Sequence, residues 1–229
     1  MIATCSSVIR GESTVVDHQR FPSNYDRLSR WYDLLSGPFE SKWRDLTVRR
    51  LNITADETIL EVGCGTGHAL VRLAKAAGMA SVVVGVDLSA GMCRVARARV
   101  ARAGLTQVSI IQGDAATLPF RPGAFAAVFM SFTLELFNYE IARQVLAECH
   151  RVLAASGRLG VVALDRRERA TVITQLYDWV GRRFPGWIDC HPIPVADTLS
   201  QHGFDPTETI YGSSGGLPVA VIVARKTNV

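Results

Sequence analysis

The sequence has too few cysteines, too widely spaced, for a fold held together by disulfides or by a zinc ion. Its 229 residues contain five cysteines, an odd number, and no Cys-x-x-Cys pair brings two of them together. Disulfide frameworks and structural zinc sites both need closely spaced sets of thiols. We therefore expect free thiols in a reducing cytoplasm, and no bound metal.

Long apolar runs and a strong charge of one sign are also missing. No apolar stretch approaches the roughly 18 residues of a membrane-spanning helix. Residues 1–22 lack the basic region and apolar core of a secretory signal, so we interpret them as a flexible leader before a single domain, 23–229. The net charge is only +4, and the basic residues form no stripe interleaved with aromatic residues, which argues against a nucleic-acid partner. Two groups of arginines are compatible with peripheral contact with an anionic membrane. The sequence does not indicate an oligomeric state.

Two common nucleotide-binding loops do not match the most informative segment, Glu61-Val62-Gly63-Cys64-Gly65-Thr66-Gly67. No Lys-Ser or Lys-Thr pair follows it, which excludes a P-loop. A dinucleotide loop needs a small residue where this chain has His68, and the extra glycine comes one position early. The segment lies between an apolar run and a helical periodicity. It therefore predicts a strand, a glycine turn and a helix whose free N–H groups face a polar ligand.

From residue 58 onward, short apolar runs alternate with helical patterns. The expected strands are Thr58–Val62, Val82–Val86, Val108–Ile111, Ala126–Met130, Leu159–Leu164 and Val219–Ala224, and the expected helices cover about 67–78, 89–103, 140–153, 168–182 and 195–202. Continuously apolar strands are typical of a mostly parallel sheet with helices on both faces. The glycine-rich turn at 212–216 predicts that the last strand enters antiparallel and pairs with a strand near Thr207–Tyr211.

Polar residues follow the predicted strands at their carboxyl ends, where open α/β sheets bind ligands. Asp87 ends the second strand and can accept hydrogen bonds from both hydroxyls of a ribose; alternatively, it belongs to the N-terminal cap region of the next helix. Asp114 follows the third strand in Gly113-Asp114-Ala115, with a plain turn as its alternative role, and Ser131 ends the fourth strand. Together with the glycine loop, these residues give four positions that converge on one edge of one sheet.

The glycine loop and these residues resemble the motifs of class I S-adenosylmethionine-dependent methyltransferases. Glu148-Cys149-His150-Arg151-Val152-Leu153 also resembles this family's passage from a helix to the fifth strand. Tyr25-Asp26, Tyr32-Asp33 and Lys42-Trp43-Arg44 further resemble the UbiE-type group, which includes ubiquinone/menaquinone C-methyltransferases and bacterial phosphatidylethanolamine N-methyltransferases. The resemblance implies a Rossmann-like α/β fold: a seven-stranded, mostly parallel sheet with a late antiparallel strand. It also implies an N-terminal helical lid at 23–52 before a core at 53–229.

The resemblance implies S-adenosylmethionine as the cofactor. The residues expected to bind it are Tyr25, Tyr32, Glu61, Gly63, Cys64, Gly65, Gly67, Asp87, Leu88, Met92, Asp114, Ala115 and Ser131. Asp114 would accept a hydrogen bond from the adenine amino group, and Leu88 and Met92 would flank the ring. For Tyr25, Tyr32, Leu88 and Met92, simple packing in the core is the alternative.

The chemistry implied by the resemblance is methyl transfer from a sulfonium, which is already an excellent leaving group. The enzyme then has to orient a nucleophile and exclude water, and it needs a base only if that nucleophile loses a proton. The candidate bases are Glu135 and His191, which titrates near neutrality but can equally be structural. The implied acceptor is a small molecule or lipid, either quinol-like, another aromatic metabolite or an amine. An enzyme of this fold that catalyses cyclisation or decarboxylation, and a non-catalytic binding protein, stay open.

Overall fold

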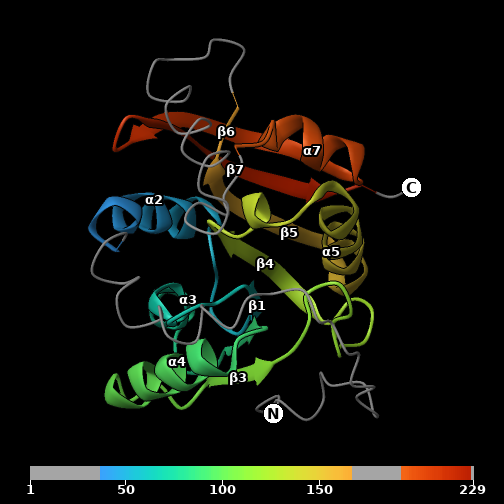
Figure 1. Cartoon of the computed structure of the whole chain (residues 1–229). Coiled ribbons are helices and arrows are strands. Elements are labelled where there is room, and N and C mark those ends of the chain that lie inside the picture. The colour runs from blue at the N-terminus through green and yellow to red at the C-terminus, as the bar shows by residue number, and fades with distance from the viewer. Residues whose placement is uncertain (1–36, 167–191, 228–229) are drawn as a thin grey trace.

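One seven-stranded sheet organises the protein (Figure 1), whose computed structural model describes residues 37–166 and 192–227. The strand order is β3-β2-β1-β4-β5-β7-β6. The strands are β1 (Thr58–Val62), β2 (Val82–Asp87), β3 (Val108–Gln112), β4 (Phe125–Ser131), β5 (Leu153–Leu164), β6 (Phe204–Ser214) and β7 (Leu217–Lys226). The first five are mutually parallel, and β7 runs antiparallel to both β5 and β6. The predicted mostly parallel sheet with a late antiparallel strand is therefore confirmed.

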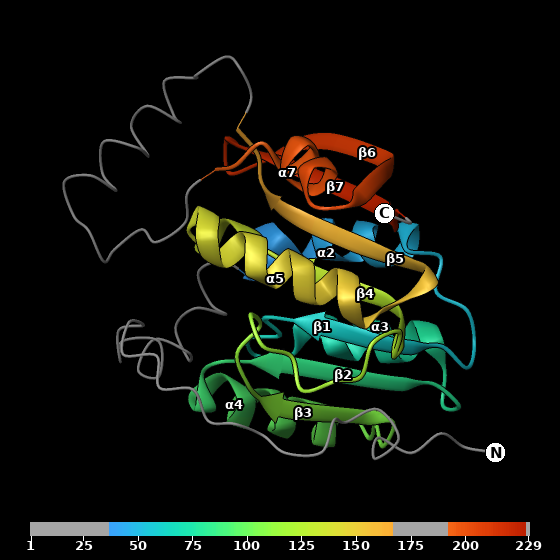
Figure 2. The ribbon, with the colours of Figure 1, turned by 90° about the vertical axis from the view of Figure 1, so that its right-hand side faces the viewer.

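Helices cover both faces of this sheet, as the two perpendicular views show (Figures 1 and 2). One face carries α2 (Gly37–Arg50), α3 (His68–Ala77) and α4 (Ala90–Arg102), and the other carries α5 (Tyr139–Val152) and α7 (Val195–Gln201). A short 3₁₀ helix, η2 (Leu134–Leu136), follows β4; its three residues are too few to give a periodic signal in the sequence.

Each face of the sheet has its own apolar core, because successive strand residues point to opposite sides. In β1, Ile59 belongs to the core under α2 and α3, whereas Leu60 belongs to the core under α5. Helix α3 completes the first core with the apolar residues that its sequence places at helical spacing: Ala69, Leu70, Leu73, Ala74 and Ala77, all buried. A fully buried leucine stabilises such a core by roughly 1.5–3 kcal/mol relative to an exposed one.

The strand order creates a crevice between the carboxyl ends of β1 and β4. After β1 the chain builds β2 and β3 on one side, and it then crosses to build β4 and β5 on the other. Val62 at the end of β1 pairs with Met130, one residue before the end of β4. The connections leave these two neighbouring ends in opposite directions, and that is where open α/β sheets bind ligands.

β5 and β6 exceed their predicted ranges by more than any other strand. β5 begins at Leu153 rather than Leu159, because Leu153 pairs with Phe125 across a register irregularity. β6 extends beyond the predicted Thr207–Tyr211 to Phe204–Ser214, because its partner β7 supplies pairs along almost its whole length. Pairing with a partner far along the sequence, rather than local apolar content, sets these ends.

Some predictions fall outside the described residues. These are the leader at 1–22, the part of the lid before residue 37, the helix at 168–182, and the single residues Tyr25, Tyr32 and His191. Within the described ranges, no helix is both long and apolar enough to cross a bilayer.

Candidate functional site

The glycine loop after β1 is held against the end of β2 by backbone hydrogen bonds. The N–H groups of Gly63 and Cys64 both donate to the carbonyl oxygen of Val86, at 2.8 and 3.0 Å. Gly63, Gly65 and Gly67 have φ angles of 68°, 50° and 80°. L-residues with side chains rarely adopt this left-handed region, which explains why the turn needs glycine. The Cys64 side chain is buried, so the residue can reach a ligand only through its backbone.

The three glycines leave different amounts of space. A Cβ at Gly63 would lie 2.3 Å from Thr133 Cγ2, and a Cβ at Gly67 would lie 3.1 Å from the Cα of Ala96 in α4. At Gly65, in contrast, no described atom lies within 4 Å of the position that a Cβ would take. Gly63 and Gly67 thus allow close packing inside the protein, whereas Gly65 leaves its backbone open to a ligand.

Asp87 connects the glycine loop to the start of α4. Its Oδ2 accepts a hydrogen bond from Gly65 N at 2.7 Å, and its Oδ1 accepts one from Ser89 N at 2.9 Å. The N-cap itself is Ser89, whose hydroxyl accepts from Met92 N. Burial raises the pKa of Asp87, and the two N–H donors partly oppose that rise. Each carboxylate oxygen can accept a further hydrogen bond, so the clamp on the loop leaves acceptor capacity for two hydroxyls.

The end of β3 brings Asp114 beside the same edge. Gly113 N donates to Asp87 O at 3.0 Å, which joins the two strand ends. Asp114 forms a turn, because its Oδ1 accepts from Ala116 N at 2.8 Å and its carbonyl accepts from Thr117 N. Asp114 thus has the role of a turn residue, which was the alternative to ligand binding, and the turn also fixes the direction of its carboxyl group. Ala115, within this turn, is partly buried against the core under α5.

Leu88 and Met92, predicted to flank an adenine ring, differ in the structure. Leu88 is 40% exposed, so it offers apolar surface to a planar ring. Met92 is buried, which favours the alternative of core packing. The difference arises at the start of α4, where the first turn decides which side chains point inward.

Three buried acceptor atoms near the ends of β1 and β4 have no hydrogen-bond partner among the described residues: Ser131 Oγ, Glu61 Oε2 and Glu135 Oε2. An unpaired buried polar atom costs about 1–3 kcal/mol. Burial raises the pKa of Glu61 well above its usual range, although the Arg44 guanidinium opposes this. A ligand with donor or cationic groups at this edge would remove part of that cost.

Glu135 combines one fixed and one unpaired carboxyl oxygen. Its Oε1 accepts from Leu164 N at the end of β5, at 3.0 Å. Burial raises its pKa to about 7; the Glu40 carboxylate adds to the rise, and the backbone N–H groups of Leu164 and of Glu135 itself oppose it. Just before it, Phe132 has a φ of 50°, an outlier for an aromatic residue of the kind that clusters at functional sites. No signal in the sequence predicts that outlier.

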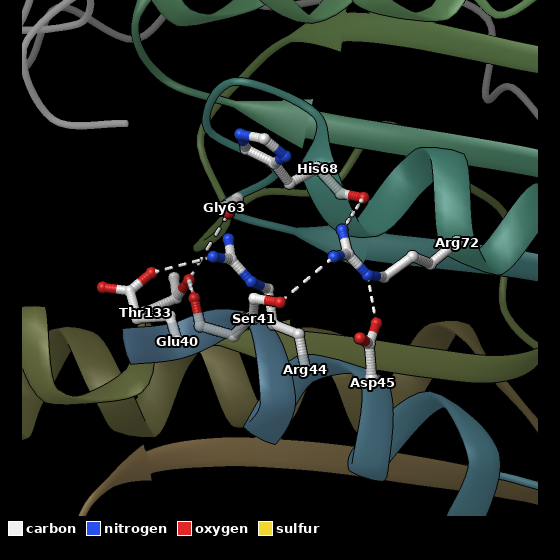
Figure 3. A network of polar contacts seen from close by, with 9 residues as sticks. Glu40, Ser41, Arg44, Asp45, Gly63, His68, Arg72 and Thr133 are labelled. Carbon is white, nitrogen blue, oxygen red and sulfur yellow. Dashed lines mark hydrogen bonds and ion pairs between the residues drawn. The ribbon is translucent and has the colours of Figure 1, made fainter. Parts of the chain in front are cut away.

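Polar contacts tie helix α2 to α3, and a separate one ties Thr133, which follows β4, to the glycine loop (Figure 3). Arg72 of α3 contacts Asp45, donates to Ser41 Oγ at 3.4 Å and donates to the carbonyl oxygen of His68. Arg44 pairs with Glu40 at 3.4 Å, and Thr133 Oγ1 donates to Gly63 O at 3.4 Å. The spacing of Phe39, Trp43 and Leu46 after Gly37-Pro38 predicts the helix α2, but the sequence gave no role to Arg72 or Thr133.

A Rossmann-like sheet that brings a glycine loop and two strand-end aspartates to one crevice defines the class I methyltransferase architecture. Among the described residues, no group of three or more His, Cys, Asp or Glu side chains could hold a metal ion. Residues 59–157 match a family model described as a methyltransferase domain.

Curated relatives of the chain are demethylmenaquinone methyltransferases. It is 32% identical to that of Shouchella clausii over 167 residues, which is 72% of this chain and 69% of the relative. It is 33% identical to that of Bacillus subtilis over 147 residues, 64% of this chain and 60% of the relative. The chain thus belongs to the UbiE-like group of S-adenosylmethionine-dependent methyltransferases. The match spans only about three fifths of the length of most of these relatives.

Solved structures agree on the fold. A SAM-dependent methyltransferase from Aquifex aeolicus superposes with a TM-score of 0.65 at 19% identity, over 91% of this chain and 100% of that chain. The [4+2]-cyclase SpnF superposes with a TM-score of 0.68 at 18% identity, over 90% and 97% of the two chains. Such low identity shows the shared fold and nothing about the reaction.

The family implies S-adenosylmethionine as the cofactor, and the residues at the crevice fit it. Gly65 leaves open space beside a backbone N–H, and Asp87 keeps capacity for ribose hydroxyls. The unpaired oxygen of Glu61 and the exposed side chain of Leu88 add a polar and an apolar contact. This set suits a ligand with a cationic end, a ribose and a planar base.

Proposed function

We propose that this protein transfers a methyl group from S-adenosylmethionine to a quinol-like aromatic acceptor. The observation that carries the proposal is the Asp87 clamp: one carboxylate fixes the open Gly65 and keeps acceptor capacity for a ribose. The curated relatives are named demethylmenaquinone methyltransferases, which supports the acceptor class.

For the cofactor, we propose that the glycine loop, Asp87 and Asp114 bind successive parts of the molecule. The start of α3 faces its polar end, Asp87 accepts from the ribose, and Asp114 accepts from the adenine amino group. Leu88 covers one face of the base. When bound, the cofactor supplies an activated methyl group on a good leaving group.

For the acceptor, we propose that Glu135 accepts the proton that the reaction releases. A hydroquinone ring that gains a methyl group at carbon loses one hydrogen, which leaves as a proton while the S–CH₃ bond breaks. Glu135 Oε2 is unpaired in the described structure and lies near the carboxyl ends of β4 and β5, and its neighbour Oε1 is held by Leu164 N. A carboxyl pKa of about 7 suits a general base at neutral pH. His191 stays a predicted second candidate.

Binding and transfer can be tested separately on the full chain. Calorimetry should show binding of S-adenosylmethionine and none of NAD, and Asp87→Asn should weaken that binding. Methyl-labelled cofactor incubated with demethylmenaquinol should then give a labelled, organic-soluble product. No binding of the cofactor would refute the proposal. Binding without labelled product from this acceptor or from a cell extract would instead indicate another reaction on this fold.

The role of Glu135 predicts a specific kinetic change. Glu135→Gln should lower kcat by roughly 10²–10⁴-fold, the usual contribution of a general base, and leave the Kd of the cofactor unchanged. The wild-type kcat should fall as the pH drops below about 7, as Glu135 becomes protonated. Glu140→Gln, on the exposed start of α5, is the matched control and should change neither value. An unchanged kcat in Glu135→Gln would remove this residue from catalysis.

We also propose that the protein works in the cytoplasm. Cys64, Cys93 and Cys149 are buried free thiols, an arrangement suited to a reducing compartment. Contact with a lipid surface stays a prediction, and sedimentation with anionic vesicles would test it.

A further inference from the structure

The segment between β3 and β4 carries Asp114 at its start and is held by an ion pair at the end of α5. Glu148 and Arg151 are one helical turn apart, and Arg151 binds the Glu148 carboxylate through two parallel hydrogen bonds, Nε to Oε1 at 2.6 Å and Nη2 to Oε2 at 2.7 Å. A bidentate pair of this kind fixes both side chains in direction as well as in distance.

The same pair binds the backbone of the segment. Glu148 Oε2 accepts from Leu118 N at 2.7 Å, and Arg151 donates to Leu118 O at 2.9 Å and to Phe120 O at 2.6 Å. Leu118 therefore has both backbone groups satisfied by side chains, much as a neighbouring strand would satisfy them. The hydrogen bonds that Arg151 donates to the Glu148 carboxylate raise the pKa of Arg151, so the guanidinium stays charged.

Apolar contacts and a fourth hydrogen bond to the backbone of the segment complete this anchor. Leu118 and Phe120 are buried, and the ring of Phe120 meets that of Phe125 edge-on at 4.9 Å. Gly123 N donates to the carbonyl oxygen of Arg151 at 3.0 Å. The far half of the segment is thus fixed to α5, while the near half is fixed to β2 through Gly113.

Only three residues separate Asp114 from Leu118, and the turn closed by Thr117 N spans them. A displacement of Leu118 therefore moves the turn that carries the Asp114 carboxyl group. Displacements of about 1 Å at a binding group can cost up to 10²-fold in function.

We propose that Glu148 and Arg151 are positioning residues for the nucleobase end of the cofactor site: their ion pair fixes Leu118 and Phe120 and thereby sets where Asp114 meets the base. This inference rests on the proposed function. It gives a role to the Glu-x-x-Arg spacing, whose significance the sequence leaves open.

The same helix provides a matched control. Glu140 and Arg143 have the same identities and spacing on α5, at 3.6 Å, but their side chains are 70% and 56% exposed. Glu148 and Arg151 are 19% and 25% exposed. Changing the first pair therefore removes equal charge from the same helix without touching the segment that carries Asp114.

The test measures base discrimination on the full chain by calorimetry. The two probes are S-adenosylhomocysteine and S-inosylhomocysteine, which carries a carbonyl in place of the adenine amino group. Wild type should prefer the adenosyl compound. Glu148→Gln and Arg151→Met should each raise its Kd about ten-fold and lower the preference ratio, because a misplaced Asp114 no longer distinguishes the two bases. Arg151→Lys should restore little, because one ammonium cannot serve Glu148, Leu118 and Phe120 together.

Each outcome decides the inference. Glu140→Gln and Arg143→Met should leave both Kd values and their ratio unchanged. A lower melting temperature with an unchanged ratio in the Glu148 and Arg151 variants would mean that the pair only stabilises the fold, and it would overturn the inference. If Arg151→Met does not fold, Glu148→Gln, which keeps an acceptor for Leu118 N, carries the test. Wild-type protein that binds neither compound would overturn the proposed function as well.

Discussion

Exchanging Gly63 and Gly65 separately for alanine should separate the stability of the glycine loop from its binding role. Both residues have positive φ, so each alanine carries a backbone strain of about 1–2 kcal/mol. Only the Gly63 side chain would also collide, because its Cβ would lie 2.3 Å from Thr133 Cγ2 and 2.6 Å from Thr133 Oγ1. Overpacking of this kind adds about 1–3 kcal/mol.

The expected loss of unfolding free energy is therefore about 2–5 kcal/mol for Gly63→Ala and about 1–2 kcal/mol for Gly65→Ala. Binding should show the reverse order. The Gly65 methyl group enters space that no described atom fills, so it should weaken cofactor binding more than its effect on stability suggests.

Urea denaturation and calorimetry on the same samples measure the two effects. Adding Thr133→Ala to Gly63→Ala removes the colliding atoms and leaves Thr133 Cβ at 3.1 Å, so the double variant should recover the overpacking part. Equal destabilisation by the two alanines would refute the assigned collision. A Gly65→Ala variant that binds the cofactor as wild type does would refute the open ligand space.

Three further changes test separate parts of the structure. Arg158→Met should lower the free energy of unfolding in urea by about 2–4 kcal/mol, because Arg158 binds Glu57 bidentately where both side chains are 18% exposed. Arg50→Met, which removes the more exposed pair with Glu208, should lower it by only about 0–1 kcal/mol. Equal losses would contradict this reasoning. Glu135 binds its proton more tightly in the folded state, so wild-type stability should fall from pH 4.5 to about 7. Glu135→Gln should lack this slope. The free energy of unfolding of the variant minus that of wild type should therefore rise by roughly 3 kcal/mol between low pH and pH above 7; parallel pH curves would contradict the burial argument. Asp87→Asn should raise the cofactor Kd about ten-fold, because an amide cannot accept from Gly65 N and Ser89 N and also serve a ribose; an unchanged Kd would remove Asp87 from the site.

The fold could be predicted because its signals are local. Continuous apolar runs mark strands buried on both faces, and the spacing of Leu70 and Leu73 marks a helix with one apolar face. The ends of β5 and β6 could not be predicted, because they depend on partners such as Phe125 and the residues of β7. Local patterns carry no information on such pairing.

The positions of the strand-end residues were predictable for a related reason. Once the strands are placed, Asp87, Asp114 and Ser131 must fall at their carboxyl ends. The contacts of Thr133 with Gly63, 70 residues apart, and of Glu148 with Leu118, 30 residues apart, come only from the folded chain. Met92 shows the limit for single side chains, because a small rotation at the start of α4 decides whether a residue faces ligand or core.

The proposed site for the methyl donor uses mostly backbone groups, whereas that for the methyl acceptor uses side chains. This difference explains why the sequence identifies the methyl donor but not the methyl acceptor. The donor side consists largely of backbone groups and glycine spacing, which tolerate few alternatives and so leave a recognisable pattern. On the proposed acceptor side, the side-chain atom Glu135 Oε2 has no described partner that fixes it. Glu135 is anchored to β5 through Leu164, whereas Asp87 is anchored to the glycine loop through Gly65. A change at Glu135 therefore need not disturb the Asp87 clamp, so proteins of this group can vary in acceptor while the donor pattern stays the same.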